Sequence, residues 1–174
     1  MILKGELIDL VSIEISDVNE TYLSWLNDKS VMKGIATSGY TLNSLRDYVK
    51  EKISHESTVF KKIIFKENNL HIGNVKLDFH DGAANTSELG ILIGEKEYWG
   101  KGLATEACRL ILNYAFHVQG LRKVWLAVYE NNPGAKFLYE KIGFRVEGCM
   151  RKHVFSDGLY LDKYIMGIFK EEFK

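Results

Sequence analysis

Residues 88–107 read ELGILIGEKEYWGKGLATEA, and this stretch decides the fold. Its first seven residues form an apolar run of strand length, and Leu103 opens a helical pattern. Between them, Gly100 and Gly102 remove two side chains where the chain turns. Bare main-chain N–H groups at the positive end of a helix can bind a phosphate. The stretch therefore predicts a strand, a turn and a helix. The turn is either a plain connection or a phosphate-binding loop.

The glycine turn matches neither of the two common nucleotide-binding motifs. Thr105 stands where the G-x-G-x-x-G fingerprint has its third glycine, and the stretch lacks the G-x-x-x-x-G-K-[ST] pattern of a P-loop. Lys101 adds a cation between the two glycines, and it is either a phosphate contact or a solvated lysine.

The composition indicates one globular domain over residues 1–174, with 46% hydrophobic and 26% charged residues. Lysine plus arginine balance aspartate plus glutamate at 23 each, which excludes a global basic field for nucleic acid. No apolar run approaches the roughly 20 residues that span a membrane. Cys108 and Cys149 have no partners at zinc spacing, so we expect no metal site. We expect a cytoplasmic protein, since no signal peptide is evident.

Hydrophobic periodicity predicts an α/β fold (α+β by some schemes) with a mixed, mostly antiparallel sheet, one parallel crossover and flanking helices. Strands are expected at residues 7–13, 58–66, 70–79, 88–94, 123–128, 144–155 and 159–169, and helices at 18–26, 42–53, 102–118 and 135–142. Asp17 and Thr41 are the predicted N-caps of the first two helices. The second helix is expected to bury Leu42, Leu45, Tyr48, Val49 and Ile53.

Two segments together carry a resemblance to a known family. Residues 99–104, WGKGLA, resemble the acyl-CoA pyrophosphate loop [QR]-x-x-G-x-[GA] of the GNAT N-acetyltransferases. Residues 132–144, NPGAKFLYEKIGF, resemble that family's later N-x-x-[SA]-x-x-x-Y-E-K-x-G-F segment. Residues 98–107 are similar to the RimJ/RimL-type branch. Trp99 departs from the general pattern, so the loop backbone must hold the phosphate, and Ala135 replaces a common serine.

The resemblance implies acetyl-CoA as co-substrate, bound in a gap between the strand that ends near Gly94 and the strand at 123–128. It implies that Leu92 and Ile93 offer main-chain groups to the pantetheine arm. The residues that would hold the pyrophosphate are Gly100, Lys101, Gly102, Leu103, Ala104 and Thr105. Asn132 would hydrogen-bond the pantetheine arm, or it would cap the helix that begins near Pro133.

An acetyl transfer of this kind needs a neutral amine, and a free alkylammonium has a pKa of about 10. Glu88 is the candidate base, with an exposed or ion-paired strand residue as the alternative. Tyr139 is the candidate acid toward the departing thiolate, with a core aromatic as the alternative. Asp81, His80 and Asp162 are weaker candidates for the base.

The resemblance thus implies an N-acetyltransferase that acts on a small-molecule or peptide amine, without nucleic acid or membrane partners. The expected acceptor is a protein N-terminal amine or a nucleotide-linked amino sugar. A polyamine or aminoglycoside ranks third, because the acidic residues look scattered along the chain. A non-catalytic acyl-CoA-binding sensor on the same fold is the alternative function. A homodimer is common among similar proteins.

Overall fold

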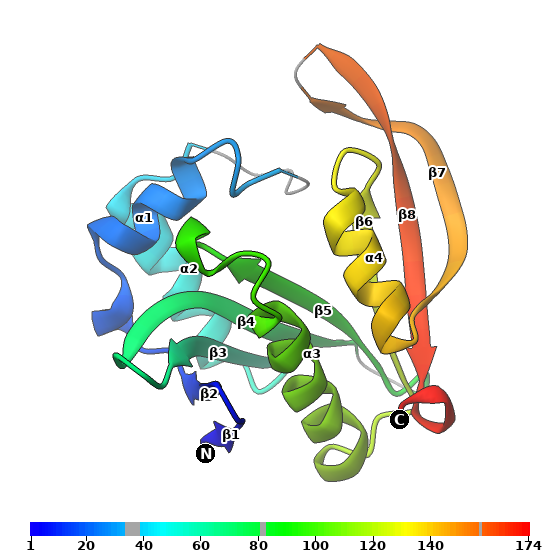
Figure 1. Ribbon diagram of the computed structural model, residues 1–174, viewed down its shortest axis with the longest axis horizontal. Coiled ribbons are helices and arrows are strands. Elements are labelled where there is room, and N and C mark those ends of the chain that lie inside the picture. The colour runs from blue at the N-terminus through cyan, green and yellow to red at the C-terminus, as the bar shows by residue number, and fades with distance from the viewer. Residues whose placement is uncertain (34–38, 81–82, 157) are drawn as a thin grey trace.

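The computed structural model describes residues 1–33, 39–80, 83–156 and 158–174. Within these residues, eight strands form one sheet in the order β1-β2-β3-β4-β5-β6-β8-β7 (Figure 1). The strands are β1 (Leu3–Lys4), β2 (Ile8–Ser12), β3 (Thr58–Phe65), β4 (Leu70–His80), β5 (Thr86–Ile93), β6 (Lys123–Tyr129), β7 (Arg145–Ser156) and β8 (Leu159–Phe169).

Four α-helices flank this sheet in the described part of the chain. They are α1 (Glu20–Asn27), α2 (Leu42–Ser54), α3 (Leu103–Asn113) and α4 (Pro133–Ile142). The helix predicted to reach residue 118 ends as a π-helical turn over Tyr114–Val118, and Gly120 follows with a φ of +68°. Such a left-handed backbone favours glycine and ends the helix.

The sheet confirms the predicted fold class. Strands β3, β4 and β5 form an antiparallel meander, and β6 returns parallel to β5 after the α3 crossover. Thr41 caps α2 as predicted, because its hydroxyl accepts a hydrogen bond from the Ser44 N–H at 3.2 Å.

Two local predictions were wrong. The N-cap of α1 is Asn19, whose side chain accepts from the Tyr22 N–H, whereas Asp17 accepts from the Glu14 N–H and pairs with Lys62. Ile53 is 41% exposed, because the last turn of α2 lies beyond the buried cluster. The predicted C-terminal hairpin is present, and its second strand, β8, lies between β6 and β7.

Two hydrophobic clusters lie on opposite faces of the sheet. Helices α3 and α4 pack on one face, with fully buried Ala107, Ile111 and Leu126 among the residues of that cluster. Helices α1 and α2 pack on the other face around Trp25 and Leu45. The part of the sheet next to α1, α2 and α3 is therefore covered on both sides.

Gly94 allows the close approach of α1 to the end of β5. A Cβ at this position would collide with ring atoms of Trp25, which packs directly on the glycine. The Trp25 indole N–H donates to the Glu95 carboxylate at 3.0 Å. A glycine at the end of β5 is thus required by packing, and it fixes α1 beside the segment that leads to the glycine turn.

We predict that Gly94→Ala lowers the free energy of unfolding by about 1–3 kcal/mol, because the added methyl group displaces the Trp25 ring. Urea unfolding followed by circular dichroism measures the change. Gly134→Ala is the matched control, since a Cβ there meets no atom within 4 Å. A stability of Gly94→Ala equal to that of the control would contradict the packing argument.

Candidate active site between the separating strands

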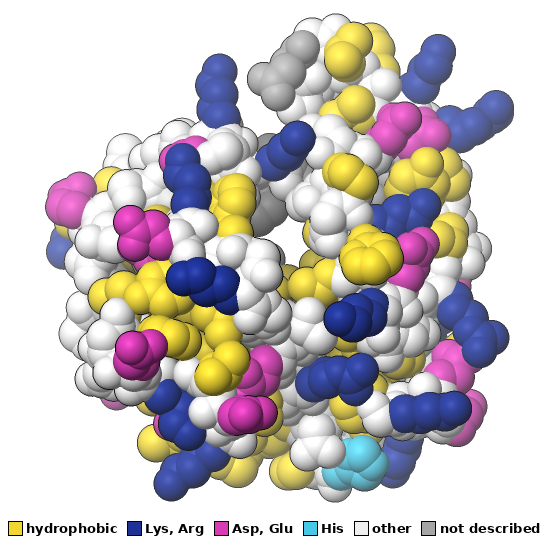
Figure 2. Space-filling model, in the orientation of Figure 1, with side chains coloured by type: hydrophobic (Ala, Val, Ile, Leu, Met, Phe, Trp, Pro, Cys, Tyr) yellow, Lys and Arg dark blue, Asp and Glu magenta, His cyan; other side chains and the backbone are white. Residues whose placement is uncertain are grey.

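Strands β5 and β6 pair over only three residues. The parallel register joins Thr86–Glu88 to Lys123–Trp125 and then ends. Beyond Glu88, β5 continues along β4 as far as Ile93, and β6 continues along β8 as far as Tyr129. The two strands therefore diverge into a V-shaped gap (Figure 1), and Figure 2 shows a hollow between the two halves of the molecule at this place.

At the end of β5, the carbonyl groups of Leu92 and Ile93 point to opposite edges of the strand. The Ile93 carbonyl accepts a hydrogen bond from the Trp99 indole N–H at 2.9 Å, so it points away from β4. The Leu92 carbonyl points toward β4, because a Cβ added at Gly73 would collide with it. The Leu92 side chain packs against the cluster of α1 and α2. The hydrogen-bonding edge at Ile93 is therefore the one that borders the gap.

The glycine turn leads from β5 into α3 with a left-handed backbone. Gly100 has a φ of +73° and Gly102 a φ of +80°, and a Cβ at either would meet no atom within 4 Å. Gly102 is the N-cap of α3, and none of the described side chains caps that end. The first N–H groups of α3, on Leu103, Ala104 and Thr105, are thus available to an anion. The ammonium of Lys101 lies 5.2 Å from the centre of the Tyr98 ring.

Glu88 lies where the two strands separate. It is opposite Trp125 in the parallel register and opposite Asp78 on β4. Among the described residues, no cation pairs with its carboxylate. Burial and then the nearby charge of Glu88 raise the pKa of Tyr129, which is the last residue of β6. Glu88 thus presents an unpaired carboxylate to the gap.

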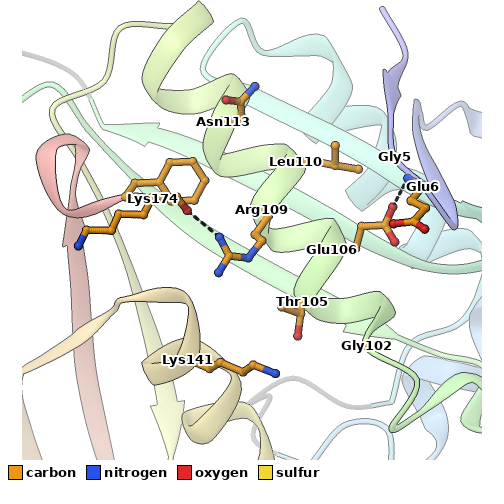
Figure 3. Close-up of a pocket in the computed structure, with 11 residues that line it drawn as sticks. Gly5, Glu6, Gly102, Thr105, Glu106, Arg109, Leu110, Asn113, Lys141 and Lys174 are labelled. Carbon is orange, nitrogen blue, oxygen red and sulfur yellow. Dashed lines mark hydrogen bonds between the residues drawn. The ribbon is translucent and has the colours of Figure 1, made fainter.

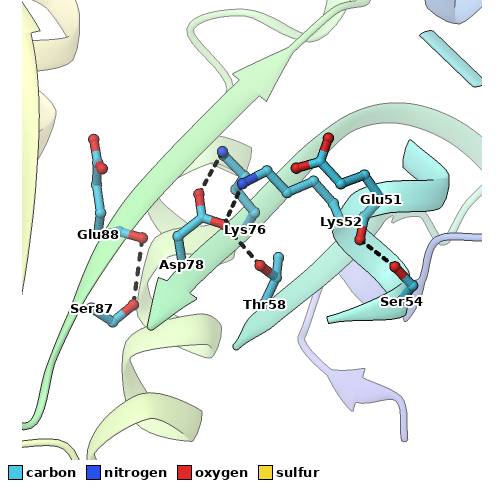
Figure 4. A network of polar contacts seen from close by, with 8 residues as sticks. All are labelled: Glu51, Lys52, Ser54, Thr58, Lys76, Asp78, Ser87 and Glu88. Carbon is cyan, nitrogen blue, oxygen red and sulfur yellow. Dashed lines mark hydrogen bonds and ion pairs between the residues drawn. The ribbon is translucent and has the colours of Figure 1, made fainter. Parts of the chain in front are cut away.

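A polar network occupies the sheet face next to Glu88 (Figure 4). The Asp78 carboxylate receives hydrogen bonds from Lys76 at 2.6 Å, Thr58 at 2.9 Å and Lys52 at 3.2 Å. Burial raises the Asp78 pKa, but these donors outweigh burial and hold the pKa below its usual range. Asp78 therefore holds one lysine from β4 and one from α2 beside the gap.

Tyr139 and Asn132 both have structural partners. Tyr139 is 8% exposed, and its ring lies 5.7 Å from that of Phe144. Burial, with a smaller effect of Cys108, raises the Tyr139 pKa, so the hydroxyl stays protonated at neutral pH. Asn132 caps α4 through the Ala135 N–H at 3.3 Å, and its amide nitrogen donates to the Lys33 carbonyl at 3.0 Å.

Of the weaker base candidates, His80 contacts Trp125, which is the partner of Glu88 in the parallel register. The ring of His80 stacks on Trp125 at 5.5 Å. Asp162 accepts the Lys152 N–H at 2.8 Å, far along β8, and Asp81 lies outside the described residues. Sequence reasoning missed the network around Asp78. The alternation of polar and apolar residues at the end of β4 was the available signal, since it places Lys76 and Asp78 on one face.

No helix within the described residues is long and apolar enough to cross a membrane. The same part of the chain holds no group of three or more His, Cys, Asp or Glu side chains that could bind a metal ion.

Sequence comparison relates most of the chain to acetyltransferases. Residues 8–145 match the family model described as an acetyltransferase (GNAT) domain. "Probable N-acetyltransferase YjcK" of Bacillus subtilis is 29% identical over 174 residues, covering 95% of this chain and 96% of that protein. The spermidine N(1)-acetyltransferase of Escherichia coli is 40% identical over 87 residues, which are 50% of this chain and 46% of that protein.

Solved structures share the fold over nearly the full chain. An acetyltransferase (GNAT family) from Bacillus anthracis has a TM-score of 0.84 at 26% identity, with 99% of this chain and 100% of that chain covered. The spermidine N-acetyltransferase from Vibrio cholerae, in complex with CoA and spermine, has a TM-score of 0.88 at 25% identity, with coverages of 97% and 98%.

We predict that Asp78→Asn lowers the free energy of unfolding at pH 7 by about 1–3 kcal/mol, because the charged acceptor of two lysines is lost. The folded pKa of Asp78 lies below the ordinary 3.8, so the wild-type advantage exists above pH 3.8 and fades as pH falls through the folded pKa. Urea unfolding at pH 7 and pH 3 measures both effects. Exposed Asp47→Asn is the control, and a difference that does not change with pH would contradict the prediction.

Proposed function

The chain belongs to the GNAT family of N-acetyltransferases, and from that premise we propose that it transfers the acetyl group of acetyl-CoA to a primary amine of a small polyamine. The observation that carries the proposal is the gap between β5 and β6 beyond Glu88. An extended pantetheine arm can add to the free edge of a strand as another strand would. The RimJ/RimL-type branch, indicated by residues 98–107, is part of the same proposal.

In the proposed cofactor site, the main chain near Ile93 hydrogen-bonds the pantetheine arm. Its carbonyl supports this role because it points away from β4, whereas the Leu92 carbonyl points toward β4. The pyrophosphate lies on the turn from Gly100 to Thr105, where uncapped N–H groups begin α3. The amide of Asn132 contacts the arm only if it gives up its hydrogen bond to Lys33.

The proposed reaction is a direct transfer between two bound substrates. The amine nitrogen attacks the thioester carbonyl carbon, a C–N bond forms, and the C–S bond breaks to release the CoA thiolate. Glu88 accepts the proton that the ammonium must lose, directly or through water. Tyr139 donates its proton to the thiolate, and the second proton that the amine nitrogen loses on forming the amide restores the Tyr139 hydroxyl. Burial raises the Tyr139 pKa, so this hydroxyl is protonated at neutral pH before the reaction.

The charge beside the gap supports a cationic acceptor. The Glu88 carboxylate has no cation partner among the described residues, while Asp78 occupies both Lys52 and Lys76. A carboxylate without a partner attracts an ammonium group. The relatives named for spermidine, one of them solved with spermine, support the same class. We therefore place polyamines ahead of the N-terminal amine and the amino sugar that the sequence favoured.

We predict that the purified protein releases CoA thiol from acetyl-CoA when spermidine is present, with an acetylated polyamine as the second product by mass spectrometry. Peptides with free N-termini, nucleotide-linked amino sugars and an aminoglycoside complete the panel. Release with one of those classes alone would reassign the acceptor. Binding of acetyl-CoA without release across the panel would favour a non-catalytic sensor.

We predict that Glu88→Gln lowers kcat by about 10²-fold or more, because the ammonium of the acceptor loses its proton acceptor. Tyr139→Phe is expected to lower kcat about tenfold or more, because the thiolate loses its donor. Both variants should keep the acetyl-CoA affinity within about twofold. Steady-state kinetics and calorimetry measure these values.

Two exposed residues of the same types serve as controls for these variants, namely Glu171→Gln and Tyr160→Phe. Neither control should change kcat. A wild-type kcat in Glu88→Gln would remove Glu88 from the mechanism, and a wild-type kcat in Tyr139→Phe would leave Tyr139 as a core residue.

A further inference from the structure

A second hollow lies on the outer side of α3, away from the gap between the strands. It has a volume of about 660 Å³ and extends along α3 from Gly102 and Thr105 past Arg109 (Figure 3). Lys141 from α4 and Lys174 near the end of the chain form the wall opposite α3. Since Gly102 and Thr105 belong to the proposed pyrophosphate turn, the hollow begins where that turn ends.

In this hollow, the negatively charged side chains lie on one side and the positively charged side chains lie on the other. On one side, Glu106 of α3 extends toward the N-terminal segment that holds Glu6, and its carboxylate accepts the N–H groups of Glu6 at 2.5 Å and Leu7 at 3.0 Å. Arg109 and Lys141 lie on the side of α4. If the pyrophosphate binds at the turn, a further anionic group in the hollow would therefore bind on the α4 side, away from the carboxylates.

Lys141 is the cation best placed for such an anion. Figure 3 shows its side chain extending from α4 toward the first turn of α3, near Thr105. Among the described residues, its ammonium has no hydrogen-bond or ion-pair partner. Arg109 is held by a hydrogen bond of 2.7 Å from one guanidinium nitrogen to the main-chain oxygen of Lys174, and its other N–H groups remain for a ligand.

Coenzyme A carries a phosphate on the 3′-oxygen of its ribose, one sugar away from the pyrophosphate. We infer that Lys141, with Arg109 beside it, binds this 3′-phosphate and so selects CoA thioesters over their 3′-dephospho analogues. The inference rests on the proposed function, because the pyrophosphate must lie on the turn that ends at Thr105. A ligand seated there places its next anionic group in the hollow, where these two cations meet it.

The test compares acetyl-CoA with acetyl-3′-dephospho-CoA as ligands in calorimetry. We expect the wild-type protein to bind acetyl-CoA about tenfold more tightly. Lys141→Gln should reduce this preference to about twofold or less, while the affinity for the dephospho ligand stays unchanged. Lys141→Arg should keep the preference, since the cation is retained. Lys136→Gln is the control on the same helix, because its ammonium instead lies 4.4 Å from the centre of the Tyr164 ring.

The outcomes separate this inference from the proposed function. Equal binding of both ligands by the wild type, or an unchanged preference in Lys141→Gln, would overturn the role of Lys141 and leave the acetyltransferase proposal standing. A chain that binds neither ligand would overturn both. An equal loss of affinity for both ligands in Lys141→Gln would show a structural effect of the substitution and would also overturn the inference.

Discussion

The structure depends on the separation of β5 from β6 after three parallel residue pairs. A main-chain N–H or C=O left without a partner in a buried place costs about 1–3 kcal/mol, so a sheet does not open without compensation. Here β4 holds β5 and β8 holds β6, and each strand keeps its outer neighbour to its end. The Trp99 indole satisfies the Ile93 carbonyl at the open edge. The remaining edge is a place where an extended ligand can complete the sheet.

The two hydrophobic clusters fix different helices on the two faces of the sheet beside this gap. On the face of α3 and α4, the tight packing of residues such as Ala107 and Ile111 fixes the N-terminus of α3 next to the gap. On the opposite face, α1 and α2 cover the sheet around Trp25, with Gly94 permitting the contact. In the proposed complex, the phosphate end of the cofactor would lie at the N-terminus of α3, and its thioester end would lie near Glu88.

Electrostatic balance beside the gap is local and does not follow from the zero net charge of the chain. Asp78 binds two lysines at distances of 2.6 and 3.2 Å, so its single negative charge is shared between two ammonium groups. Glu88, its neighbour in the strand register, has no such partner among the described residues. Two carboxylates on one sheet face thus differ because only one of them is within reach of lysine side chains.

The sequence by itself determined the succession of strands and helices, the Thr41 cap and the two motifs, because periodicity, capping and glycine turns are local signals. The tertiary structure decided the insertion of β8 between β6 and β7, the meeting of Asp78 with Glu88, and the approach of Lys141 to α3. These contacts join residues that are distant in the chain. A local pattern reports which face of a strand or helix is buried, whereas strand order and side-chain partners depend on how the whole chain packs.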